Sequence, residues 1–332
     1  MSFRIKTDGT TSDVDLTFFS QVAEKTNGTV EALLAEHSLS VAEVEIFFTS
    51  NVMSVSSDAR GALGNPPETR SGIDRVGGIV AGKTLLDASG LKACIYINPL
   101  LFDPADSLST VFGAFTIVHE FGHVLHDVQR HAAIGATEEV SSPWDLAGMF
   151  GLLAANEFRA DQLACLILPH VITLTDGEGR TLNVSELMGN PHLEGFEGYL
   201  DVIIPGLPKI VHDYRTRKID LVHMWNEVAR ISGEAAILCA HVDALRTEDQ
   251  DLAKEFSEHR ASELISKFWT PVAQHLKTSP MIPSTDGWAE DRATIWELSR
   301  AGWLSSWESL GIRASAEGDH FRLDIDSGDF PR

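Results

Sequence analysis

The residues best suited to chemistry are two histidines four positions apart, His119 and His123, with Glu120 between them. On a helix this spacing places both imidazoles on one face, with about 5–6 Å between their Cβ atoms. Two imidazoles so placed can bind one zinc ion at roughly 2.0–2.1 Å each. Glu120 is rotated by about 100° from His119, so it flanks the ion and can take a proton from water. The pattern therefore predicts a Zn²⁺ site with Glu120 as its general base.

The surrounding residues indicate that this pattern lies on a buried helix. Residues 111–131 form a strong helical segment whose apolar side chains cover a wide surface: Ala114, Ile117, Val118, Phe121, Val124 and Leu125. Burying two histidines and a glutamate without a metal costs free energy. The alternative is a chance match on a soluble helix, in which each histidine is only hydrogen-bonded.

A third ligand is expected, because a catalytic zinc site has three protein ligands and leaves the fourth position to water. The best candidate is Glu157, 34 residues after His123, on a second predicted helix at 145–168. Asp161 lies one turn further along the same face. There it can accept the N–H of a ligating histidine and fix its tautomer.

Other assignments of the acidic residues stay open. Glu157 could belong to an ordinary ion-paired helix face near Arg159. Glu138 or Glu139, in the connecting loop, could be the third ligand instead. A helix, however, holds Glu157 more rigidly than a loop would hold Glu138 or Glu139.

The sequence indicates the residues that contact a substrate less clearly than it indicates the metal ligands. His126 lies on the same side of the helix as His119 and His123, where it can touch substrate or support a ligand. A helix-end histidine favoured by the macrodipole is the alternative. A group that stabilises the oxyanion is also expected. The sequence does not choose among the candidates, which are Tyr96, Tyr199, Tyr214, His131 and His170.

A second motif competes with the metal site. Residues 77–84 match the phosphate-binding pattern G-x-x-x-x-G-K-[ST] in full. A phosphate-binding loop of this kind follows a buried strand and opens a helix. Here the polar segment 70–75 precedes the motif, and Gly90 interrupts any helix after it. We therefore interpret the motif as a glycine-rich strand edge and turn.

The hydrophobic pattern predicts an α+β fold in three parts. Residues 1–60 are expected to form a helical N-terminal subdomain, with its helices within 13–50, followed by a loop or linker. Residues 75–205 would form the catalytic domain, and 206–332 a mainly helical C-terminal region. The expected strands are 76–80, 92–99, 171–174, 181–184 and 320–325. Trp296, Trp303 and Trp307 share one helical face, which is typical of a core or a subunit interface.

Composition limits the possible partners. The formal net charge is −22, with 26 Lys and Arg against 48 Asp and Glu. Such a surface repels phosphate backbones and attracts basic peptides, so no direct nucleic-acid binding is expected. No signal peptide or membrane span is expected, and three isolated cysteines fit a reducing compartment. We expect a cytoplasmic protein; the sequence does not indicate its oligomeric state.

Residues 95–99, 115–123 and 157–169 resemble the ImmA/IrrE family of zinc metallopeptidases, and the resemblance covers about residues 76–170. It implies a zincin-like catalytic domain in which His119, His123 and Glu157 bind zinc and Glu120 is the base. Family members typically cleave a helix-turn-helix repressor. The expected function is therefore a zinc metallopeptidase acting on a protein or peptide, such as a transcriptional repressor. The alternatives are a zinc enzyme acting on a small molecule or modified peptide, and a regulatory protein with a non-catalytic zinc site.

Overall fold

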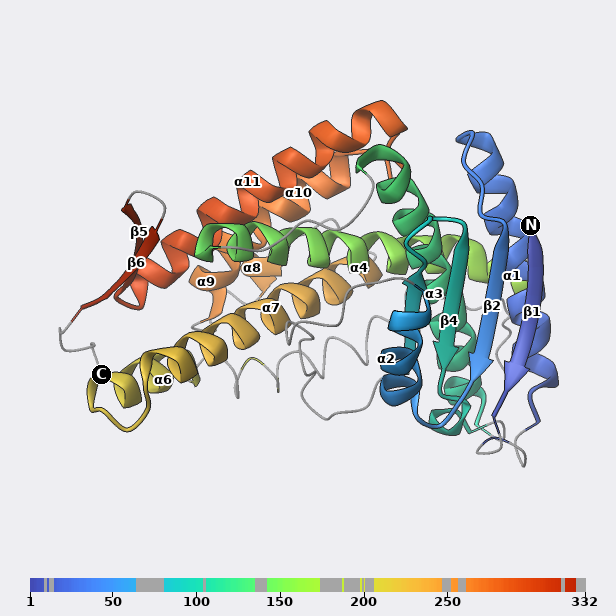
Figure 1. The fold of residues 1–332 in the computed structure, drawn as a ribbon, viewed down its shortest axis with the longest axis horizontal. Helices are drawn as coiled ribbons and strands as arrows, with labels where there is room; N and C mark the ends of the chain where they lie inside the picture. Colours follow the sequence, from blue (N-terminus) through green and yellow to red (C-terminus); the bar gives the residue numbers. More distant parts are fainter. Residues whose placement is uncertain are drawn as a thin grey trace. The chain divides into compact units, whose positions relative to one another are not determined.

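The structure is a computed structural model (Figure 1). It describes residues 1–8, 11, 15–63, 81–103, 106–134, 142–173, 187, 198, 200, 206–246, 252–255, 261–317 and 320–326. Its architecture is mixed α+β, as the sequence predicted. Two compact units make up the chain. Unit 1 comprises Met1–Thr137, Arg159–Met188 and Met281–Ala289, and unit 2 comprises Glu138–Phe158, Gly189–Pro280 and Glu290–Arg332.

The sheet of unit 1 has four strands in the order β1-β2-β4-β3. Their bounds are β1 Ser2–Thr7, β2 Glu43–Phe48, β3 Gly82–Leu86 and β4 Lys92–Ile97. β1, β2 and β4 are parallel, whereas β3 pairs antiparallel with β4 and forms one edge of the sheet. Successive side chains of a strand point to opposite faces. Accordingly Val44 and Ile46 of β2, like Ile95 of β4, are fully buried.

Helices cover both faces of this sheet (Figure 1). α1 (Thr17–Glu36) and α3 (Ser107–Ile134) pack on each other and on one face, and α2 (Val52–Ala62) packs against β3 and β4 on the other. A short 3₁₀ helix, Pro99–Leu101, leads from β4 towards α3. The two layers of helix hold the sheet between them.

α3 is a core helix of unit 1. Among the described residues, its segment Leu108–Ala133 alone is long and apolar enough to cross a membrane. Of that apolar window, 67% is buried inside the protein. Its apolar side chains are thus already covered by protein, which is the packing of a core helix.

α4 (Pro143–Val171) begins in unit 2 and ends in unit 1, because the boundary between the units falls after Phe158. Unit 2 is otherwise mainly helical, as predicted for 208–310, and ends in a two-stranded sheet. Its further elements are α6 (Gly206–Arg215), α7 (Leu221–Leu245), α8 (Leu252–Glu255), α9 (Ala261–Phe268), α10 (Thr270–Thr278), most of α11 (Thr285–Ser309), β5 (Ile312–Glu317) and β6 (His320–Ile325).

The tryptophan face of α11 lies in the core of unit 2. Trp303 and Trp307 are each 1% exposed. Trp303 stacks on Phe268 with ring centroids 4.1 Å apart, and Trp307 Nε1 donates to Ser232 Oγ at 3.1 Å. For these two residues the predicted core role is confirmed, while Trp296 is half-buried.

Several predicted elements need correction. The segment 43–48, expected to be helical, is strand β2, and β1 was not predicted, so residues 1–60 do not form a purely helical subdomain. Their strands share the sheet of β3 and β4. The predicted strand at 171–174 is wrong at its start, because α4 continues to Val171. The expected strands 76–80 and 181–184 lie outside the described residues. The helices at 111–131 and 145–168 and the strand at 320–325 are confirmed, and the strand predicted at 92–99 is confirmed over Lys92–Ile97.

Candidate metal centre

Three side chains predicted as ligands lie together on α3 and α4. One ligand atom from each of His119, His123 and Glu157 lies within 4.8 Å of the others. The helical spacing of four residues brings the two imidazoles together, with His119 Nε2 and His123 Nε2 2.9 Å apart. His119 is buried, whereas His123 and Glu157 are half-buried.

Asp161 lies behind His119, as its position one turn after Glu157 predicted. His119 Nδ1 is 2.7 Å from Asp161 Oδ1, and the Asp161 side chain is only 2% exposed. An ionised carboxylate can only accept, so the imidazole donates its Nδ1–H. In the neutral ring this leaves the lone pair of Nε2 directed towards His123.

The two helices approach closely beside these residues. A Cβ added to Gly122 would lie 2.9 Å from Ala160 Cα and 3.1 Å from Ala160 Cβ. Gly122 follows Glu120 by two residues, and Ala160 precedes Asp161. The small residues therefore let the helix that carries the histidines contact the helix that carries the carboxylates.

Glu120 is buried, with 5% exposure, and lies against the edge strand β3. The Thr84 hydroxyl is 2.8 Å from Glu120 Oε2. Burial of a carboxylate requires polar partners, and this hydroxyl is one of them. This contact holds the Glu120 carboxylate against β3.

The donor set fits a zinc ion. Two imidazole nitrogens and one carboxylate oxygen are usual zinc ligands, and a tetrahedral site with bonds of about 2.0–2.1 Å puts ligand atoms about 3.3 Å apart. The 2.9 Å between the two Nε2 atoms is close to that separation. The same distance also suits an imidazole–imidazole hydrogen bond. The three donors, with an acceptor on His119 Nδ1, are thus a group that could hold a metal ion.

His126 is placed in the core. It is 6% exposed, eight residues before the end of α3, so the helix-end alternative is wrong. Burial lowers the pKa of His126 well below its ordinary value, and the charge of Arg159 acts in the same direction. Its deep burial makes His126 a core residue of unit 1 and does not support a substrate contact.

Tyr96 lies on the other face of the sheet from Glu120. It packs with Val52, Leu85 and Cys94 under α2 and stacks on Phe47, with ring centroids 5.2 Å apart. Burial raises the pKa of the Tyr96 hydroxyl. The prediction of an oxyanion contact is therefore wrong for Tyr96, because strand alternation turns its ring away from α3.

The remaining candidates do not gather at the centre. His131 packs beside Gly90, His170 is exposed at the end of α4, and Tyr214 lines a separate hollow in unit 2. Glu138, Glu139 and Tyr199 lie outside the described residues. Cys94 and Cys239 are buried, and burial raises the pKa of each thiol.

Contacts of the centre with two other elements, α7 and β3, were not predicted. His241 Nε2, on α7, is 3.6 Å from Glu157 Oε2. Gly82 and Thr84, on β3, contact Glu120. Both relationships join segments far apart in the chain, and no local pattern marks them. The only sequence signal near β3 was the phosphate-binding match, which pointed to different chemistry.

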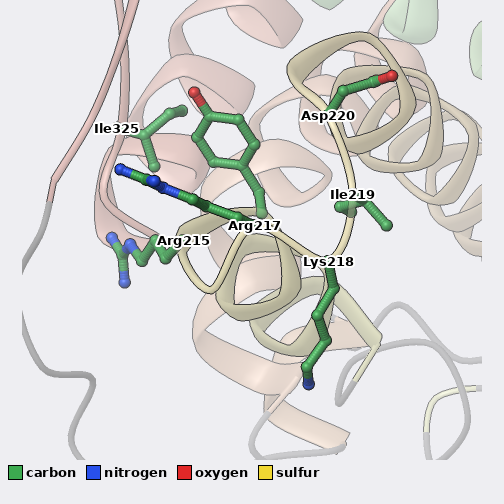
Figure 2. A pocket seen from close by; sticks show the side chains of 7 residues that line it. Arg215, Arg217, Lys218, Ile219, Asp220 and Ile325 are labelled. Carbon is green, nitrogen blue, oxygen red and sulfur yellow. The ribbon is translucent and has the colours of Figure 1, made fainter.

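Unit 2 contains a hollow of about 560 Å³ at the turn from α6 to α7 (Figure 2). It is lined by Tyr214, Arg215, Arg217, Lys218, Ile219, Asp220 and Ile325. Arg217 caps α6 with a left-handed φ of 59°, and its N–H donates to Tyr214 O at 2.9 Å. Lys218 pairs with Asp213 at 2.8 Å. The lining is basic and partly apolar, and offers no group of metal ligands.

Comparison with protein-family models, with curated proteins and with solved structures finds no match for this chain. The centre is therefore interpreted from its own geometry. It combines the imidazoles of His119 and His123, the carboxylate of Glu157 and a buried acceptor, Asp161, behind His119. Glu120, the neighbour of His119 in the chain, is held by Thr84 of β3.

Proposed function

We propose that this chain is a zinc-dependent metallopeptidase with a zincin-like catalytic domain. The observation that carries the proposal is the convergence of His119, His123 and Glu157, with Glu120 in the same turn of α3 as the histidines. Two imidazoles and one carboxylate leave room for water and substrate at a tetrahedral ion. The resemblance of residues 76–170 to ImmA/IrrE peptidases supports a peptide bond as the bond that is hydrolysed.

The roles of the residues follow from their positions. Zinc bound here would polarise the scissile carbonyl and lower the pKa of water towards about 7. Glu120 would accept a proton from the attacking water and donate it to the leaving amine. Asp161 would hold His119 in the tautomer that ligates through Nε2. The chain thereby supplies ligands, orientation and a single proton carrier.

The substrate class is a protein or peptide. The net charge of −22 favours basic segments, because opposite charge speeds encounter and guides orientation. A regulatory protein such as a transcriptional repressor is the target that the family resemblance suggests. The proposed place of action is the cytoplasm.

One observation favours a second candidate function, a non-catalytic zinc site in a regulatory protein. His241 Nε2 lies 3.6 Å from Glu157 Oε2, close to a candidate ligand. A fourth protein ligand would close the site to water, which is the mark of structural zinc. The second candidate therefore predicts zinc without turnover.

The test combines metal analysis with turnover. Wild type and Glu120→Gln, each loaded with Zn²⁺, are incubated with a quenched-fluorescent peptide library containing basic and acidic members. We expect one zinc per chain in both proteins and cleavage, mainly of basic peptides, by wild type alone. Equal cleavage by Glu120→Gln would exclude Glu120 as the base. Zinc binding with no cleavage by wild type would favour the non-catalytic site.

A further inference from the structure

We infer that strand β3 is built to hold the carboxylate of Glu120, with Gly82 and Thr84 as its positioning residues. The inference rests on the proposed function and deepens it, because it assigns the support of the proposed general base. Their contacts at this site are with Glu120. Both act through Glu120.

Gly82 makes space for the glutamate side chain. A Cβ added at Gly82 would lie 2.6 Å from Glu120 Oε1, 2.7 Å from Cγ and 2.9 Å from Cδ. Those distances are shorter than any normal contact, so the end of Glu120 occupies the volume that a side chain at this position would fill. Glycine at this position therefore leaves room for the Glu120 side chain against the strand.

Thr84 supplies the hydrogen bond. Its Oγ1 lies 2.8 Å from Glu120 Oε2 and 2.9 Å from the main-chain oxygen of the same residue. A hydroxyl has one hydrogen to donate and two lone pairs to accept with. It can donate to the carboxylate. When Oε2 carries a proton, it can accept from that proton and donate to the main-chain oxygen instead. One side chain therefore fits both forms of Glu120 without a shift of heavy atoms.

Alternate residues of β3 face the same side of the sheet, which explains why Gly82 and Thr84 act together. Gly82 and Thr84 are two apart and face α3, whereas Lys83 faces the opposite side, opposite Tyr96 in the pairing with β4. The three residues are the Gly-Lys-Thr of the phosphate-binding match. After Thr84 the strand continues to Leu86, and no helix begins there. The glycine and the hydroxyl that seemed suited to a nucleotide are thus accounted for by Glu120.

The direct test removes the Thr84 hydroxyl and keeps the shape of the side chain. Thr84→Val keeps a β-branched residue in the strand but removes the donor, and Thr84→Ser restores it. With Zn²⁺ loaded and the peptide cleaved fastest by wild type, we expect Thr84→Val to lower kcat by about 10- to 100-fold. KM and zinc content should stay unchanged, and Thr84→Ser should keep most of kcat. Unchanged kcat in Thr84→Val, or an equal loss in Thr84→Ser, would overturn the inference.

Matched controls separate positioning from general destabilisation. Thr26 is also buried and donates its hydroxyl to Val22 O at 2.8 Å within α1, so Thr26→Val should lower thermal stability and leave kcat unchanged. Gly82→Ala should push the carboxylate aside and lower kcat, since the obstructing atoms belong to a flexible side chain. Gly28→Ala adds a Cβ with nothing within 4 Å of it, so this variant should leave kcat unchanged. A kcat loss in the controls that equals the loss in the β3 variants would contradict the inference.

A measurement without turnover distinguishes this inference from the proposed function. In zinc-free protein, Thr84→Val should lower the Tm by about 2 °C when Glu120 is present, and by clearly less in a Glu120→Ala background. If wild type cleaves no peptide but this coupling is found, the peptidase proposal fails and the support of Glu120 by β3 stands. Equal Tm shifts in both backgrounds would overturn the support, whatever the activity.

Discussion

Asp161 Oδ1 on α4 lies 2.7 Å from His119 Nδ1 on α3, so a buried carboxylate fixes the imidazole ring of a proposed ligand. This contact lies on the side of the ring away from Nε2, which faces His123. It orients the ring nitrogen that is the proposed donor. The contact also joins the two helices that carry the proposed site.

Removing this contact should weaken metal binding more than folding. We expect Asp161→Asn to lower Zn²⁺ affinity by about 10- to 100-fold, because the amide no longer carries the negative charge behind the ring. Competition with a chelating dye measures the affinity. Asp127→Asn is the matched control on α3, since Asp127 pairs with Arg130 at 3.2 Å and, among the described residues, no ion pair joins it to a proposed ligand. Equal affinities of Asp161→Asn and wild type would contradict the assigned role.

Gly122 sets the distance between α3 and α4. Because the added Cβ would lie 2.9 Å from the Ala160 main chain, Gly122→Ala must push the helices apart. Such overpacking costs about 1–3 kcal/mol of unfolding free energy. We expect lower thermal stability together with weaker zinc binding. Gly61→Ala, with open space around the added Cβ at the end of α2, should show neither effect.

His126 should make the stability of zinc-free protein depend on pH. Burial lowers the pKa of His126 in the folded state, so below its ordinary value of about 6.5 the unfolded chain takes up a proton that the folded chain does not. Its contribution to stability is therefore complete above about pH 6.5 and is lost as the pH falls below it, at up to about 1.4 kcal/mol per pH unit. His126→Leu should remove this part of the dependence of the unfolding free energy on pH. Chemical unfolding at several pH values between 5 and 8 measures it, and parallel curves for the two proteins would contradict the prediction.

The helices of the centre could be predicted because their signals are local. His119, His123 and the apolar residues around them repeat with helical spacing, as do Glu157 and Asp161 on α4. β2 was missed although Val44, Ile46 and Phe48 alternate as in a strand. Phe47 interrupts this alternation in the sequence, and the partners that allow Glu45 to be buried, Lys6 and Lys92, lie on strands distant in the chain.

The support of Glu120 could not be predicted, because it depends on long-range packing. Thr84 precedes Glu120 by 36 residues, and its contact exists only because α3 crosses the edge strand. The pattern at 77–84 even suggested a nucleotide. The contact of His241 with Glu157 spans a still longer stretch of the chain. Spacing within one element predicted ligands, whereas their supporting partners come from other elements.

His241 distinguishes the two candidate functions. At 3.6 Å its Nε2 is too far from Glu157 Oε2 for a direct hydrogen bond. If His241 only orients Glu157, His241→Ala should keep one zinc per chain and lower Zn²⁺ affinity by no more than about 10- to 100-fold. X-ray absorption should then show three protein ligands and one water-derived oxygen in both proteins. If wild type instead shows a third imidazole that His241→Ala lacks, the zinc site is closed by protein and the non-catalytic function is favoured.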